Sequence, residues 1–177
     1  MPAREASVAD LVGTVLGKYR LLERVGSGGM ADVYRGVHVG RYREVAVKVQ
    51  KPEVAAQLRS DLAVLRSFAS AADRFTRVGR RVRLSDWLSE FSRTLRMELD
   101  YEAEAGNLHR FGQHLAPYPE LSVPQPVMDL CGKRVLTMEL VGGVRVDAVP
   151  RVRRTEQRME PLAAALVRGY LDQIFVH

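Results

Sequence analysis

Three strand-like segments around a glycine-rich turn constrain the fold of this 177-residue chain more than any other feature. Residues 19–25 and 32–37 have strand character, and the turn between them, residues 26–29, is a strong break signal. Residues 44–50 alternate valine with polar or small residues, which is the period-two pattern of a strand with two different faces. The chain therefore begins as a three-stranded unit whose first turn is rich in glycine.

Two helices are expected after these strands. Apolar residues recur at three- and four-residue steps behind Pro52, on one helix face: Val54, Leu58, Leu62, Leu65, Ala69 and Ala72. An arginine-rich connection is expected to run from there to about Leu84. Ser85 is a favourable N-cap for the second helix. Its buried stripe would consist of Leu88, Phe91, Leu95 and Leu99.

The remaining sequence predicts two more strands, 127–130 and 134–140, around a turn at 131–133, and a last helix over about 155–176. This order predicts an α+β fold, a five-stranded antiparallel sheet with helices inserted after its third strand. The expected division is an N-terminal tail at 1–17, a lobe at 18–140, and a hinge with the start of a second lobe at 141–177. One side of the last helix is expected to be poorly covered, with marginal stability or self-association as the result: Leu162, Leu166, Tyr170 and Ile174.

Composition limits the partners. The net charge is +6, and arginines cluster at 74–83 and 151–158. These clusters could bind nucleic acid such as RNA, anionic lipid or phosphate groups, or they could form a solvated basic face. Few aromatic residues interleave with them, so we predict no specific nucleic-acid partner. The chain has one cysteine, Cys131, and no apolar run approaching the ~20 residues of a membrane span. We therefore expect a cytoplasmic setting, with peripheral contact to an anionic membrane as an option.

The glycine-rich turn has the chemistry of a phosphate-binding loop. Glycines let backbone N–H groups approach phosphate oxygens closely. The turn lacks the Gly-Lys-Ser/Thr of a P-loop, and the strand that follows it excludes a Rossmann fingerprint. The G-x-G-x-x-G-x-V loop of protein kinases fits better, with Ala31 at its third glycine and with these residues matched: Gly26, Ser27, Gly28, Gly29 and Val33. A plain hairpin turn would use the same residues.

A lysine follows the glycine-rich turn at the spacing found in protein kinases. Lys48 ends the segment Val45-Ala46-Val47-Lys48, fifteen residues after Val33. A lysine among apolar strand residues is costly to bury unless it is paired. In kinases such a lysine holds the α- and β-phosphates and pairs with a helix glutamate. The alternative is an exposed lysine on an edge strand.

An acidic constellation at residues 98–104 supplies candidate partners. If this segment is one helix, Asp100 and Glu104 are four residues apart and share a face, while Glu98 points elsewhere. Two like charges on one face repel unless a cation lies near them, and Lys48 is the natural candidate. The alternative is an acidic, solvated helix face.

Four spaced motifs together resemble the UbiB/AarF family of atypical kinases. They occur in order over residues 45–52, 98–107, 135–139 and 173–177, and the resemblance covers nearly the whole chain from Tyr19. The E-x-D element formed by Glu98 and Asp100 is a signature of that family and not of ordinary protein kinases.

The resemblance implies roles for individual residues. Lys48 would bind the phosphates of ATP and pair with Glu104, and Ala46 would line the nucleotide site. Glu98 and Asp100 would form a regulatory acidic motif. Met138 would be the gatekeeper, and the hinge from Glu139 to Val141 would hold adenine through its backbone. The family is linked to ubiquinone and related isoprenoid lipids, with ATPase or unorthodox kinase activity.

This sequence departs from the family pattern in three ways. The family has an alanine-rich loop where this chain has residues 26–29, which resemble bacterial Ser/Thr kinases. The K-x-G-Q element expected upstream is not found. The catalytic H-x-D-P-H-P-G-N and D-F-G elements would follow His177, so Mg²⁺ is expected only in a full-length protein, and residues 1–177 alone are predicted to be inactive. The alternatives are a non-catalytic module that binds a nucleotide or a partner, such as a missing second lobe, and a fragment of an ordinary Ser/Thr protein kinase.

Overall fold

The computed structural model describes residues 11–40, 43–145, 148–149 and 160–175. Within these ranges five strands pair antiparallel in chain order: β1 (Val15–Leu16), β2 (Tyr19–Ser27), β3 (Ala31–His38), β4 (Glu44–Gln50) and β5 (Val135–Glu139). The helical elements are α1 (Val54–Phe75), α2 (Arg77–Val82), α3 (Leu84–Glu98), α4 (Tyr101–His114), the 3₁₀ turn η1 (Met128–Leu130) and α6 (Glu160–Phe175). The α+β class predicted from the sequence is confirmed.

The sheet buries apolar side chains on both faces. Leu21, Tyr34, Val45 and Val47 form the core of one face, each with 2% or less of its surface exposed. α4 covers part of the other face, where its Tyr101 and Ala105 pack with Ala31 and Leu136. The alternation expected of β4 explains this arrangement, because successive residues of a strand point to opposite faces.

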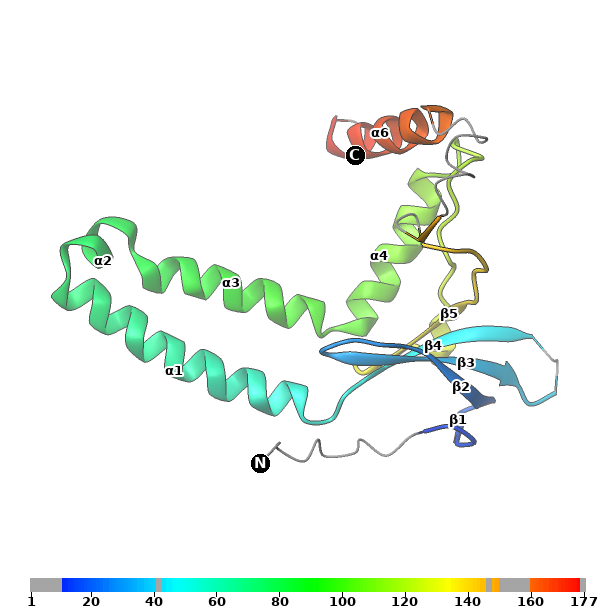
Figure 1. Ribbon diagram of the computed structural model, residues 1–177, viewed down its shortest axis with the longest axis horizontal. Coiled ribbons are helices and arrows are strands. Elements are labelled where there is room, and N and C mark those ends of the chain that lie inside the picture. The colour runs from blue at the N-terminus through cyan, green and yellow to red at the C-terminus, as the bar shows by residue number, and fades with distance from the viewer. Residues whose placement is uncertain (1–10, 41–42, 146–147, 150–159, 176–177) are drawn as a thin grey trace.

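Helices α1 and α3 lie side by side as an arm that extends away from the sheet, with α2 at its tip (Figure 1). Their shared core is small and centres on Leu62, Ala69 and Leu88. The arginine-rich connection expected near the tip contains α2, a short helix that begins where Thr76 Oγ1 accepts a hydrogen bond from the Gly79 N–H. Gly79 lies against α1, since a Cβ added there would come within 2.2 Å of the Ala72 carbonyl oxygen.

The start of α3 differs from the expectation that Ser85 is its N-cap. Arg83 precedes the helix in a left-handed conformation, with φ of 55°. Asp73 of α1 accepts hydrogen bonds from the N–H groups of Leu84 and Ser85 and from the Ser85 hydroxyl. The orphan donors of the helix start are therefore satisfied by a residue from the neighbouring helix, which local sequence could not reveal.

One predicted strand is corrected, and one observed strand was not predicted. Residues 127–130 do not form a strand, because Leu130 and Cys131 donate i→i+3 bonds to Val127 and Met128 and close the turn η1. The fifth strand is instead β1, within the range expected to be a tail. Gly17, with φ of +59°, makes the tight turn that lets Leu16 pair with Tyr19.

The last helix matches its prediction over the described residues. α6 covers 160–175, and residues 155–159 and 176 of the expected helix lie outside the described ranges. Gly169 packs against Leu115 and Leu121, which holds α6 beside the end of α4. Most of the stripe expected to be poorly covered is exposed: Leu166, Tyr170 and Ile174.

Candidate nucleotide-binding site

The glycine-rich loop joins β2 and β3 in a hairpin. Gly26 pairs with Val33 and Ser27 with Asp32, and the Gly28 N–H donates to the Ala31 carbonyl at 2.8 Å. Neither Gly26, Gly28 nor Gly29 has a positive φ. A Cβ added at Gly29 would meet nothing within 4 Å, and at Gly28 it would make ordinary contact. Neither backbone conformation nor packing within the described residues therefore requires these glycines.

Lys51 fixes the base of the loop, a role that sequence reasoning missed. Its Nζ donates to the Gly28 carbonyl at 2.8 Å and lies 3.7 Å from Oδ1 of Asp32. Asp32 is 3% exposed and also accepts a hydrogen bond from the Ser27 hydroxyl at 2.6 Å. Local sequence carries no signal of this role, because it depends on the register of β3 and β4, in which Gln50 pairs with Ala31 and places residue 51 beside the loop.

Lys48 and Glu104 form the central ion pair of the site. β4 places Lys48 directly across from Val33 of β3 and Leu136 of β5. The Lys48 Nζ lies 2.8 Å from each carboxylate oxygen of Glu104, on α4. Both side chains are partly buried, at 26% and 34% exposed. The pair thus joins the sheet to α4 just beneath the glycine-rich hairpin.

Tyr101 completes the surroundings of Lys48, and sequence reasoning missed this contact as well. The Lys48 ammonium lies 4.6 Å from the centre of the Tyr101 ring, within range of a cation–π contact. Burial, and secondarily the charge of Glu104, raises the pKa of the Tyr101 hydroxyl. The ring therefore stays neutral at physiological pH and places an aromatic face beside the ammonium group.

Two of the residues expected to contact adenine, Ala46 and Met138, lie on the same face of the sheet as Lys48. Ala46 pairs with Met138 across β4 and β5, and Met138 packs against the cluster formed with α4. The Glu139 side chain binds Arg43 at 2.9 Å, and its backbone N–H donates to Gln125. Val141 follows the sheet and is exposed. These placements are compatible with a hinge, and the roles of Met138 to Val141 remain predictions.

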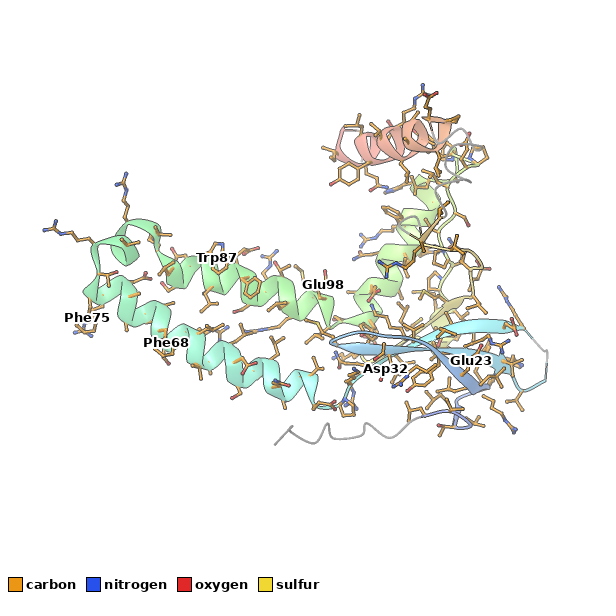
Figure 2. The ribbon with its side chains drawn as sticks, viewed as in Figure 1. Glu23, Asp32, Phe68, Phe75, Trp87 and Glu98 are labelled. Atoms are coloured by element: carbon orange, nitrogen blue, oxygen red, sulfur yellow. The ribbon has the colours of Figure 1, made fainter. Side chains whose placement is uncertain are left out.

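The two residues of the acidic motif do not converge on Lys48. The chain changes direction at Leu99, so residues 98–104 do not form the single helix assumed from the sequence. Glu98 ends α3 and is exposed (Figure 2). Asp100 is the N-cap of α4, where its Oδ1 accepts the Ala103 N–H at 3.2 Å. Only Glu104 reaches the lysine, because it lies one turn into α4.

Neither a metal centre nor a membrane span is found among the residues that the structure describes. No three His, Cys, Asp or Glu side chains in these ranges group closely enough to hold a metal ion. No helix within them combines the length and the apolar character needed to cross a bilayer.

Comparison with known proteins identifies a family that matches most of the chain. Residues 11–177 match the ABC1 atypical kinase-like domain. The chain is 33% identical over 153 residues to the probable protein kinase UbiB of Azotobacter vinelandii, covering 86% of this chain and 28% of that protein. It is 35% identical over 114 residues to the uncharacterized protein Rv0647c of Mycobacterium tuberculosis, covering 63% of this chain and 23% of that protein.

A solved structure shares the fold. The chain superposes on Rv3197 of Mycobacterium tuberculosis, solved in complex with erythromycin, with a TM-score of 0.63 and 26% identity. The match covers 78% of this chain and 33% of that one. The chain spans between 23% and 28% of the length of the curated relatives it matches.

Proposed function

Since the chain belongs to the ABC1 atypical kinase-like family, we propose that it forms the ATP-binding part of an atypical kinase or ATPase. The observation that carries this proposal is the Lys48–Glu104 pair beneath the glycine-rich loop. The two bonds to Glu104 use two of the three N–H donors of the ammonium group. A third donor can therefore reach a phosphate oxygen while Glu104 holds the lysine in place.

The glycine-rich loop supports the same proposal. Space is open around Gly29, and Lys51 holds the loop from its base through the Gly28 carbonyl. Close approach of a ligand is the remaining physical reason for glycines at these positions. Backbone N–H groups would then contact the phosphates, Lys48 would balance part of their charge, and Ala46 and Met138 would lie against the adenine ring.

The test is equilibrium titration with a fluorescent ATP analogue. Lys48→Met should weaken binding at least about tenfold, because the ammonium contact to the phosphates is lost. Lys133→Met is the matched control, since it removes the same charge from an exposed turn. Gly29→Ala should weaken binding without changing the unfolding midpoint, because its methyl group enters space that only a ligand would use. Equal affinities for wild type and Lys48→Met would refute the proposal.

The finer activity is also proposed by analogy with the family. For a full-length member of the family we propose phosphoryl transfer or ATP hydrolysis, the use of Mg²⁺, and a link to ubiquinone or related isoprenoid lipids. Mg²⁺ would neutralise charge on the phosphates. Because the described residues offer no cluster that could hold a metal, we assign none of them as a Mg²⁺ ligand.

We also propose an anionic membrane surface as a partner, contacted by the arm. Phe68 and Phe75 project from the outer edge of α1 and are 70% and 76% exposed, and Trp87 of α3 is 63% exposed (Figure 2). Arg77 and Arg81 belong to α2, the short helix at the tip of the same arm (Figure 1). Exposed aromatic residues beside arginines are typical of segments that dock to anionic lipid.

Co-sedimentation with vesicles tests the membrane proposal. Vesicles of phosphatidylcholine containing phosphatidylglycerol should retain the protein, and pure phosphatidylcholine should not. Arg77→Gln/Arg81→Gln and Phe68→Ser should each reduce retention. Retention that is the same on both lipids, or unchanged in these variants, would contradict it.

A further inference from the structure

A second candidate site lies on the arm, apart from the nucleotide site. Two adjoining cavities, of about 470 and 480 Å³, open between α1, α3 and the start of α4. Arg66 of α1 and Arg96 of α3 line both cavities, which therefore adjoin, and we call the two together the arginine groove. Volumes of this size are typical of small-molecule sites.

The groove gathers positive charge from both helices. Arg59 lines one cavity and Arg93 the other, in addition to Arg66 and Arg96. Arg93 lies 4.0 Å from Glu90 on the exposed surface, a weak pairing. Among the described residues, Arg66 and Arg96 form no ion pair. The carboxylate of Asp100 also lines the groove, but its Oδ1 accepts the Ala103 N–H at the start of α4.

The groove also has an apolar floor. Leu58 and Leu62 of α1 and Leu99 at the end of α3 line its first cavity. Leu62 is 4% exposed and belongs to the core of the arm, so the floor is fixed by packing between the helices. A site with several guanidinium groups above an aliphatic floor is complementary to a ligand that is anionic at one end and apolar at the other.

The arginine groove is separate from the exposed phenylalanines of α1. Arg59 and Arg66 are seven residues apart and therefore lie on nearly the same side of α1. At 100° per residue, Arg66 lies about 160° around the helix from Phe68. The groove and Phe68 thus face different directions, and the two surfaces can be tested independently.

We propose that the arginine groove binds a single-chain amphiphile with a phosphate head group. Arg66 and Arg96 contact the phosphate oxygens, with Arg59 and Arg93 on either side, and the alkyl chain lies along Leu58, Leu62 and Leu99. Arginine suits this task because its planar fork of N–H donors matches two phosphate oxygens at once. The proposal does not depend on nucleotide binding at Lys48.

Isothermal titration calorimetry of the whole chain with dodecyl phosphate, below its micelle-forming concentration, tests the proposal. We expect one binding event that is at least about tenfold tighter than binding of inorganic phosphate or dodecyl maltoside. Equal binding of inorganic phosphate would reduce the groove to an unspecific anion site. Equal binding of the maltoside would show apolar adsorption without head-group recognition. Either outcome overturns the proposal.

Two double variants locate the site. Arg66→Gln/Arg96→Gln should weaken dodecyl phosphate binding about tenfold or more, because both shared contacts are lost. Arg77→Gln/Arg81→Gln removes the same net charge at the tip of the arm and should leave the affinity unchanged. If Arg77→Gln/Arg81→Gln loses binding and Arg66→Gln/Arg96→Gln keeps it, the amphiphile binds at the tip of the arm and the proposal is wrong.

Two further measurements separate this proposal from the nucleotide proposal and locate the site in wild-type protein. Lys48→Met should retain dodecyl phosphate binding, so that failure of the nucleotide proposal and failure of this one are distinguishable. In wild-type protein, NMR of alanine methyl groups should show shifts on titration at Ala55 and Ala103, which line the groove, and none at Ala31 and Ala165. Shifts confined to alanines outside the groove would contradict the assignment even if a variant failed to fold.

Discussion

The sheet with α4 and the helical arm use their apolar residues in opposite ways. In the sheet, Leu21, Val45 and Leu136 are fully buried, and α4 covers the face that carries Lys48. In the arm, Leu62 is buried but Phe68 on the same helix is 70% exposed. A region that buries its own apolar side chains can hold site residues such as Lys48 in place. A region that leaves apolar side chains exposed offers surfaces to partners.

The largest expected change in the free energy of unfolding tests whether the stability of the protein comes mainly from the sheet. Leu136→Ala should lower the free energy of unfolding by about 2–5 kcal/mol, because it opens a cavity between β5 and α4. Phe68→Ala should change it by less than about 0.5 kcal/mol, since that side chain has little packing to lose. Urea unfolding followed by circular dichroism measures both. Similar losses in the two variants would break the comparison.

Gly79→Ala should have the next largest effect and should act on the arm alone. Its Cβ would lie 2.2 Å from the Ala72 backbone oxygen, so α2 must shift away from α1, at a cost of about 1–3 kcal/mol. Hydrogen exchange should accelerate in α1 and α2 and stay unchanged in β3 and β4. Gly106→Ala is the control, because a Cβ there meets nothing within 4 Å. Equal acceleration in arm and sheet would show that they unfold as one unit.

Acid is expected to have a smaller effect, a loss of stability where Asp73 of α1 holds the start of α3. Hydrogen bonds from the Ser85 hydroxyl, then from backbone N–H groups, hold the pKa of Asp73 below its usual value. A carboxyl group with a lowered pKa stabilises the fold above its unfolded pKa of about 3.9, and this contribution is lost as pH falls through the folded pKa.

Hydrogen exchange of the first turn of α3, measured from pH 5 down to pH 3, checks this prediction. Protection relative to β4 should fall over this range in wild type and should vary less in Asp73→Asn, which cannot titrate. A parallel decline in both proteins would exclude Asp73 as the cause.

The smallest effect concerns the exposed ion pairs of the sheet. Arg35 binds Glu23 and Glu44 at 2.7 Å each, but all three side chains reach solvent. Arg35→Met should shift the urea midpoint far less than Leu136→Ala, and the shift should shrink further in 0.5 M salt, because water and ions screen such pairs. A large, salt-independent shift would mean that charge pairing, and not apolar burial, distinguishes the sheet from the arm.

The sequence predicted the sheet better than the arm for a physical reason. The period-two pattern of β4 and the glycine turn are local signals, and they placed Lys48 on a strand beside the loop. The family resemblance was confirmed as well. The strand expected at 127–130 was wrong because local i→i+3 bonds compete well in so short a segment. Two residues at Val15–Leu16 formed a strand only because Gly17 turns them back onto β2.

The parts of the site that were missed depend on contacts between distant segments. Lys51 fixes the loop through a carbonyl 23 residues earlier, and Tyr101 reaches Lys48 from another element. The change of direction at Leu99 removed Asp100 from the face it was expected to share with Glu104. Spacing within one helix could not reveal that break, because the residues around it are compatible with a continuous helix.

Labelling with an acyl-phosphate derivative of ATP tests the central claim most directly. Such a probe acylates the lysine nearest the bound phosphates, and mass spectrometry can compare the lysines of the chain, namely Lys18, Lys48, Lys51 and Lys133. We predict that Lys48 is the main labelled residue, that excess ATP blocks its labelling, and that Glu104→Gln reduces it. Labelling that is spread equally over the lysines, or that excess ATP does not block, would contradict a phosphate site at the Lys48–Glu104 pair.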